Sequence, residues 1–402
     1  MKKIQSSLGL QLLLTLVVGA LLGKGLPQFA PFYQFLGKAF ISLINMVIIP
    51  LVFPIVVVAV ATVIRQKSFG KILAQSLTYF FVITTTITLI FVFVAHFFGF
   101  GSGVNIGQEG ASVEGIANSI EWETFFLNFI PANIIKSFSE GALLPIIVFA
   151  IFLGYGVGNL DKSRGQAVLD SLQVWIDSIY QIVQVVIKLS PVGILGFIAK
   201  DVATTGLDKL FGLGQFVFGT YLAYAGLALV IFPLIAFASG TSYRQTVRQI
   251  WELLTLAFIS GSSSVVLPPL LNNLKENGYD ETVTDFVIPL GYTFNLEGAA
   301  VYFSVATIFI ANAYGIQFSV PELFYVVLLL TLIGKTAATV PSGAIVVLLA
   351  AAPQLGLPVE GVALIFSVDF FVNAGRTALN VLGQVLAVRV IEKISKEKVV
   401  AE

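Results

Sequence analysis

Six polar side chains recur through an otherwise apolar stretch near the C-terminal end of the sequence. They are Asp369, Asn373, Arg376, Thr377, Asn380 and Gln384. On an α-helix this spacing places all six within a stripe about 100° wide. Such a stripe is costly in a membrane helix unless it faces a cavity or a partner charge. Arg376 stays protonated and therefore needs an anion. An ion pair with Asp369 would supply one but would leave the other stripe residues unexplained. A guanidinium also binds carboxylates through paired hydrogen bonds, so the stripe predicts a carboxylate-binding site.

A second polar cluster precedes it in the long apolar run 286–313. Thr293, Asn295 and Glu297 lie between Gly291 and Gly298, which predicts an unwound stretch whose carbonyl groups could coordinate a cation. Glu297 could be a cation ligand, a proton carrier, a neutral buried acid or a purely structural residue. Burial disfavours the ionised form of a carboxyl group, so protonation of Glu297 is physically accessible.

Two further places carry polar groups beside predicted helix breaks. Ser262, Ser263 and Ser264 offer hydroxyl and backbone N–H groups at a helix N-terminus, where an anion is favoured. Lys335 permits two interpretations. Its side chain could extend to the membrane interface, or its ammonium could sit among carbonyl groups in place of a bound cation.

The elements that position these residues are membrane helices. The chain has 402 residues, of which 57% are hydrophobic and 11% charged, whereas soluble domains carry about 25% charge. The sequence has no cysteine and a single histidine. The absence of cysteine excludes disulfides, thiolate metal sites and Cys nucleophiles. The single histidine, His96, ends an apolar run beside Phe97 and Phe98 and is interpreted as an interfacial residue rather than a functional one. We therefore expect no enzyme, no cofactor and no catalytic or metal cluster.

The apolar runs are long enough to span a bilayer, which takes about 20 helical residues. We interpret the first run, 8–22, as a transmembrane helix rather than a signal peptide, because no small-residue cleavage site follows it. Basic clusters at 2–3, 65–71, 162–164, 244–248 and 393–398 fit one cytoplasmic face. Both termini are then expected in the cytoplasm.

Two units in the second half are apolar but interrupted. Residues 249–259 and 265–271 flank a break at 260–264, and residues 322–332 and 344–355 flank a break at 334–343. Each arm is too short to span alone, so each unit is predicted to be a re-entrant helical hairpin. The two enter from opposite faces, which is typical of an inverted repeat. Irregular backbone at membrane depth must be enclosed by protein, so the two tips are expected to meet around one site.

The motifs together resemble those of the dicarboxylate/amino acid:cation symporters, which include the glutamate transporters. The segment 262–268 is similar to the family's first hairpin tip, and 339–343 (TVPSG) resembles the tip of the second. PLGYTFNLEGA at 289–299 is similar to the pattern PLGxTxNMDGT, and DFFVNAGRTALN at 369–380 resembles D-x-x-x-D-x-x-R-T-x-x-N. The resemblance covers nearly the whole chain and is strongest over 260–390.

The resemblance implies an all-α fold of eight transmembrane helices and two re-entrant hairpins, assembled as a homotrimer and working by an elevator motion. Residues 1–72 would be scaffold helices, 73–100 a helix of the transport domain, 101–205 an extracytoplasmic loop with mainly scaffold helices, and 206–402 the transport core. Arg376 would bind the distal carboxylate of the substrate. The rest of the pocket is expected from Asp369, Asn373, Thr377, Asn380, Ser263, Ser264, Val340 and Gly343.

Several residues depart from the family's pattern. The second aspartate of the final motif, which in the amino-acid transporters engages the substrate ammonium, is Asn373 here. This shifts the expected substrate toward C4-dicarboxylates and leaves an acidic amino acid such as aspartate or glutamate as the alternative. The sodium-ligating aspartate is replaced by Gln384, and the aspartate of NMDGT by Glu297. Phe80 and Ile83 stand roughly where sodium-binding members have Tyr and Thr.

These departures predict that sodium coupling is weakened or lost. The residues expected to serve coupling are Glu297, Asn295, Thr293, Gln384 and Lys335. Of the two coupling ions, H⁺ is favoured over Na⁺, with Glu297 as the proton carrier.

We therefore expect a secondary symporter of a small carboxylate in a prokaryotic inner membrane, with the lipid bilayer and the substrate as partners and no nucleic acid. Two other functions stay open on the same fold. An anion-conducting channel would not concentrate its solute, and a non-transporting binding protein would bind its ligand without flux.

Overall fold

The computed structural model describes residues 8–65, 70–104, 127, 130–205, 208–335 and 343–399, and the regular structure within them is helical. The α-helices are α1 (Leu8–Gly25), α2 (Ala30–Arg65), α3 (Gly70–Phe97), α5 (Ile134–Glu140), α6 (Leu143–Gly158), α7 (Lys162–Thr205), α8 (Asp208–Gly226), α9 (Phe232–Ala238), α10 (Tyr243–Ser260), α11 (Ser263–Glu276), α12 (Glu281–Phe294), α13 (Glu297–Ala313), α14 (Val320–Gly334), α15 (Gly343–Ala351), α16 (Val359–Phe366) and α17 (Asp369–Val399). Short 3₁₀ turns occupy Pro27–Phe29 and Ala352–Leu355, and a π-helical turn, Leu227–Ile231, joins α8 to α9.

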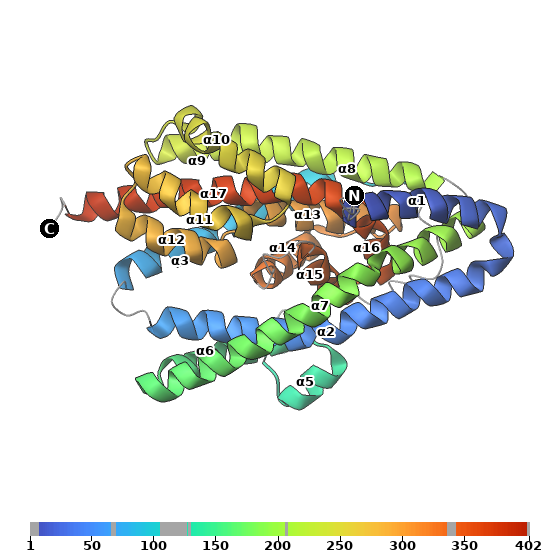
Figure 1. The fold of residues 1–402 in the computed structure, drawn as a ribbon, viewed down its shortest axis with the longest axis horizontal. Coiled ribbons are helices and arrows are strands. Elements are labelled where there is room, and N and C mark those ends of the chain that lie inside the picture. The colour runs from blue at the N-terminus through green and yellow to red at the C-terminus, as the bar shows by residue number, and fades with distance from the viewer. Residues whose placement is uncertain are drawn as a thin grey trace, which may run out of the picture.

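The helices pack in two groups. Helices α1, α2 and α6 pack against one another or against the long α7, and the Trp175 indole N–H of α7 donates to the Pro50 carbonyl of α2 at 2.9 Å. Figure 1 shows α2, α6 and α7 along one side and α8 to α13 with α17 along the other, with α14, α15 and α16 between them. The expected division into scaffold and transport core stays a prediction.

Helix α13 forms the centre of the second group. All of its residues except Asn312 are buried, and it packs against α3, α8, α14 and α17. A helix that is apolar all round must be enclosed on every side. Polar groups carried by α13 are therefore held inside the protein.

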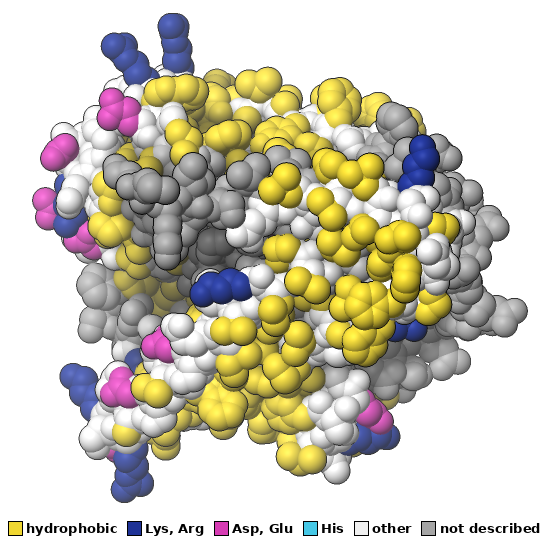
Figure 2. Space-filling view, turned by 45° about the vertical axis from the view of Figure 1, so that its right-hand side comes forward, with side chains coloured by type: hydrophobic (Ala, Val, Ile, Leu, Met, Phe, Trp, Pro, Cys, Tyr) yellow, Lys and Arg dark blue, Asp and Glu magenta, His cyan; other side chains and the backbone are white. Residues whose placement is uncertain are grey.

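The outer helices expose apolar side chains, such as Leu21 on α1, Val174 on α7 and Phe218 on α8. Figure 2 shows hydrophobic side chains spread over one face, with most of the charged ones toward its margins. Among the described residues, Ile72–Phe97, Gly212–Ala238 and Glu281–Ala313 are long and apolar enough to cross a membrane. Two bent pairs, one of them α16 with α17 at 81°, would bring the total to five, so the expected eight spans stay a prediction.

The first predicted hairpin corresponds to α10 and α11, which pack against each other. Helix α10 ends at Ser260 and α11 begins at Ser263, so the predicted break at 260–264 is confirmed. Gly261 caps α10 with φ of +59°, a left-handed conformation that glycine adopts without steric cost.

The second predicted hairpin corresponds to α14 and α15, which also pack against each other. Between Lys335 and Gly343 the chain, Val340 included, lies outside the described residues. The run expected at 286–313 is interrupted at residues 295–296, between α12 and α13. This interruption confirms the unwound stretch predicted around Asn295.

Candidate carboxylate and cation site

The Arg376 guanidinium is the centre of the polar stripe on α17. Its Nη1 donates to Asp369 Oδ1 at 2.9 Å, and its Nη2 donates to Asp369 Oδ2 at 3.3 Å and to Asn373 Oδ1 at 2.7 Å. Its Cζ atom lies 4.4 Å from the centroid of the Tyr302 ring on α13, within cation–π range. A guanidinium carries five N–H donors. The ion pair with Asp369, which the sequence offered as an alternative to a substrate carboxylate, is thus present, and it leaves guanidinium N–H donors for a second carboxylate.

The tip of the α10–α11 pair meets this stripe at Asn373. The Asn373 side-chain amide donates to the Gly261 carbonyl at 2.9 Å. A Cβ on Gly261 would lie 2.6 Å from the same amide nitrogen, so a larger residue there would have to displace the Asn373 side chain. Ser263, the first residue of α11, is buried. The predicted approach of the first hairpin tip to the α17 stripe is therefore present.

The start of α13 lies directly against α17. Gly298 packs on the Arg376 backbone, where a Cβ would be 2.4 Å from the Arg376 carbonyl oxygen. The Ala299 N–H donates to Asn380 Oδ1 at 3.2 Å. Thr377 donates its hydroxyl to the Asn373 carbonyl at 2.8 Å, on its own helix. Close contact at Gly298 places its neighbour Glu297 next to the carboxylate stripe.

The Glu297 carboxyl group is fully buried in the angle between α13 and α17. Among the described residues neither of its oxygens has a hydrogen-bond partner. The group fills the space left by Gly383 of α17, where a Cβ would lie 2.2 Å from Oε2 and 2.7 Å from Oε1. A buried carboxyl without hydrogen-bond partners is expensive in the ionised form. The pocket suits a carboxyl group that takes up and releases a proton.

The neighbouring polar side chains surround Gly291 of α12. A Cβ there would be within 3.6 Å of Gln384, Phe80 and Asn295. The Asn295 amide and the Gln384 amide nitrogen are buried without partners among the described residues. Phe80, which is 1% exposed, adds only apolar surface and its backbone carbonyl. The Thr293 side chain and that of Ser264 lie outside the described residues.

Lys335 caps α14 and extends inward. Its ammonium donates to the Phe80 carbonyl at 3.1 Å, to Thr84 Oγ1 at 2.8 Å and to the Phe294 carbonyl at 2.6 Å. The interpretation that this side chain extends to the membrane interface is wrong, because three acceptors within the protein bind its tip. The interpretation that it sits among carbonyl groups is the one the structure supports.

The structure thus brings Asp369, Asn373, Arg376, Asn380, Glu297 and Lys335 into one region, with Ser263 at its edge. Three contributors were missed: Thr84, Tyr302 and Gly383. Thr84 follows Phe80 by one helical turn on α3. Because Phe80 was already singled out in the sequence, this spacing could have indicated that the Thr84 hydroxyl lies at the same site. Gly383 carries no functional group, so only its position opposite Glu297 reveals it.

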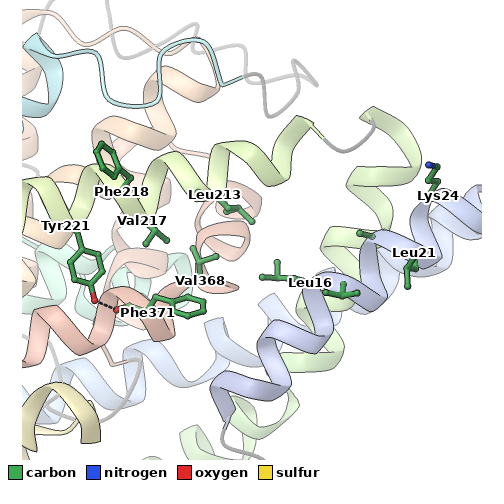
Figure 3. A pocket seen from close by; sticks show the side chains of 12 residues that line it. Leu16, Leu21, Lys24, Leu213, Val217, Phe218, Tyr221, Val368 and Phe371 are labelled. Atoms are coloured by element: carbon green, nitrogen blue, oxygen red, sulfur yellow. Dashed lines mark hydrogen bonds between the residues drawn. The ribbon is translucent and has the colours of Figure 1, made fainter.

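A cavity of about 970 Å³ lies beside the start of α17, and its lining is mostly apolar, with Lys24 and Tyr221 as the polar side chains. Figure 3 shows Leu16 and Leu21 of α1 on one side and Leu213 and Val217 of α8 on the other. Near it the Tyr221 hydroxyl donates to the Phe371 carbonyl at 2.7 Å (Figure 3). The polar stripe residues Asp369, Arg376 and Asn380 are not among the residues that line this cavity.

Comparison with known proteins agrees with this geometry. The model of the Sodium:dicarboxylate symporter family matches residues 8–394, almost the whole chain. The chain belongs to this family. It is a multi-pass membrane transporter and not an enzyme. The resemblance found in the motifs at 289–299 and 369–380 is confirmed.

Three relatives illustrate the range of named activities. A proton/glutamate-aspartate symporter of Escherichia coli is 34% identical over 98% of this chain and 94% of its own length. A proton/sodium-glutamate symport protein of Bacillus subtilis is 33% identical, with coverage of 98% and 94%. A C4-dicarboxylate transport protein of Pseudomonas fluorescens is 33% identical, with coverage of 97% and 90%. These names differ in both substrate and coupling ion, so for this family member both must be argued from its own residues.

Proposed function

We propose that this transporter is a proton-coupled symporter of a small dicarboxylate, with C4-dicarboxylates preferred and aspartate or glutamate carried less well. The observation that carries the proposal is the buried Glu297 carboxyl group, which has no hydrogen-bond partner among the described residues and lies beside the Arg376 site. Relatives named as proton symporters and as C4-dicarboxylate transporters support it.

The substrate preference follows from the groups around Arg376. Its guanidinium binds one carboxylate of the substrate, and Asp369 holds it in place. Asn373 presents a neutral amide to the same pocket, already donating to Gly261. A substrate ammonium would gain no ion pair there, whereas a dicarboxylate needs none. Both substrate classes bind, but an amino acid leaves its ammonium group without an ion pair and therefore binds less tightly than a dicarboxylate.

Proton coupling follows from the charges. Arg376 and Lys335 offset Asp369 and Glu297, so a doubly charged anion arrives at a region with no net charge to receive it. The Glu297 carboxyl group is buried without a hydrogen-bond partner among the described residues, which disfavours its ionised form. The negative charge of the substrate disfavours that form further, so anion and proton bind together.

The architecture expected from the family completes the proposal. It comprises eight spans, two re-entrant hairpins related as inverted repeats, cytoplasmic termini in a prokaryotic inner membrane, and a homotrimer whose transport core moves against the scaffold. Arg376 is only 3% exposed, so a substrate reaches it after neighbouring elements separate. The second hairpin, α14 and α15, is the proposed gate.

The test is uptake of labelled succinate and aspartate into proteoliposomes. An inward proton gradient without sodium is expected to drive accumulation, and a sodium gradient at equal pH on both sides is not. The Glu297→Gln variant should still bind succinate but should no longer concentrate it. Accumulation that requires sodium would overturn the proposed coupling.

The same assay separates the other functions. A channel equilibrates succinate without concentrating it, and a binding protein gains heat stability with succinate but shows no flux. Either result would overturn the symport mechanism.

A further inference from the structure

The Lys335 ammonium occupies a cage of oxygen atoms contributed by two other elements. Phe80 and Thr84 belong to α3, and Phe294 is the last residue of α12, where the helix breaks before α13. Both carbonyl groups can only accept hydrogen bonds. The three contacts of 2.6–3.1 Å link α14 to α3 and α12 at one point.

The number of contacts fits an ammonium group. The Lys335 Nζ has three oxygen neighbours, namely the Phe80 carbonyl, Thr84 Oγ1 and the Phe294 carbonyl, and an ammonium carries three N–H donors.

Carbonyl and hydroxyl oxygens at a broken membrane helix are the ligands that a monovalent cation takes in transporters. We propose that the Lys335 ammonium is a tethered cation that fills such a site, so that α14 docks on α3 and α12 and closes over the substrate without dissolved sodium. This inference deepens the proposed function, because it explains why carboxylate binding there would need no sodium. It concerns binding at equilibrium and makes no use of a proton gradient.

The test measures succinate binding to the purified transporter by calorimetry at one pH, in choline, sodium, lithium or ammonium chloride. For the wild type we expect the same Kd in all four salts. For Lys335→Ala we expect a Kd at least tenfold weaker in choline, because the cage has lost its charge. A small monovalent cation, sodium or ammonium, should restore binding in a saturable manner.

Two control variants make the result specific. Lys188→Ala removes an exposed lysine of α7 and should bind like the wild type in every salt. Thr84→Val removes one ligand but keeps the ammonium. It should weaken binding without creating any dependence on sodium.

Three results would overturn the inference. The first is a wild-type Kd that depends on sodium; this measurement needs no variant, so it decides even if Lys335→Ala fails to fold. The second is a folded Lys335→Ala variant that binds succinate normally in choline. The third is a folded Lys335→Ala variant that has lost succinate binding and does not regain it with any of the cations. Loss of proton-driven uptake with binding unaffected would contradict the proposed function alone, so the two failures are distinguishable.

Discussion

Replacing Gly383 with alanine should displace the Glu297 carboxyl group from its pocket. A Cβ at position 383 would lie 2.2 Å from Glu297 Oε2 and 2.5 Å from Cδ. Ordinary contact begins at 3.4 Å, so the carboxyl group must retreat by about 1.2 Å, the difference between 3.4 and 2.2 Å. Adding a methyl group to a packed interior costs about 1–3 kcal/mol. The obstructing atoms are the end of a flexible side chain, so we expect a cost toward the lower bound.

The functional effect should exceed the effect on stability. A carboxyl group moved by more than 1 Å loses its relation to Lys335 and to the α17 stripe. We therefore expect Gly383→Ala to lose proton-driven accumulation while remaining folded. Glu297→Asp shortens the side chain by one methylene and withdraws the carboxyl group from Gly383, so the double variant should relieve the overlap. Residues in contact couple by about 0.5–3 kcal/mol.

The assay compares thermal unfolding and proton-driven succinate uptake for the two single variants and the double variant. The double variant should be more stable than the sum of the single effects predicts and should recover part of the uptake. Gly214→Ala on α8 is the matched control, because a Cβ there meets no atom within 4 Å. It should be neutral or slightly stabilising. Strict additivity, or normal uptake by Gly383→Ala, would refute the reasoning.

Three further predictions concern α17. Asn373→Asp places a carboxylate beside the Arg376 nitrogen now 2.7 Å from the Asn373 amide oxygen, so the ratio of aspartate to succinate affinity should rise about tenfold, or about 1.4 kcal/mol; competition binding checks this, and an unchanged ratio contradicts it. Arg376→Lys loses the paired hydrogen bonds of the guanidinium, so calorimetry should show succinate binding at least tenfold weaker; an unchanged Kd would remove Arg376 from the site. Glu392→Ala leaves the Asp280 N–H, now 2.6 Å from Glu392 Oε1, without its acceptor, which should cost about 1–3 kcal/mol. Its melting temperature should fall while uptake persists, and an unchanged melting temperature would show that this contact contributes nothing.

The features that could be predicted from the sequence are those that depend on the residues of a single helix or helix break. The breaks at 260–264 and around Asn295 lie at serine, glycine and asparagine residues that continue a helix poorly. The contact of Arg376 with Asp369 and Asn373 follows from helical periodicity, because all three belong to α17. Neither kind of prediction depends on how helices pack.

The features that could not be predicted depend on packing between distant elements. The contact of Lys335 with Thr84 joins residues 251 positions apart, and local sequence does not distinguish it from a lysine at the membrane interface. Gly383 and Glu297 lie on different helices, and a glycine in an apolar helix usually indicates only close packing. The roles of Val340, Ser264 and Thr293 stay predictions.

A lysine held in an oxygen cage also changes the work that the transporter can perform. A dissolved sodium ion that enters with the substrate contributes about 2.3 kcal/mol for each 100 mV of membrane potential, and about 1.4 kcal/mol more for a tenfold concentration gradient. In the proposed mechanism the Lys335 ammonium would make every crossing in both directions and would contribute neither. Such a carrier binds its substrate regardless of external salt, but its accumulation limit is lower by the energy of the ion it no longer consumes.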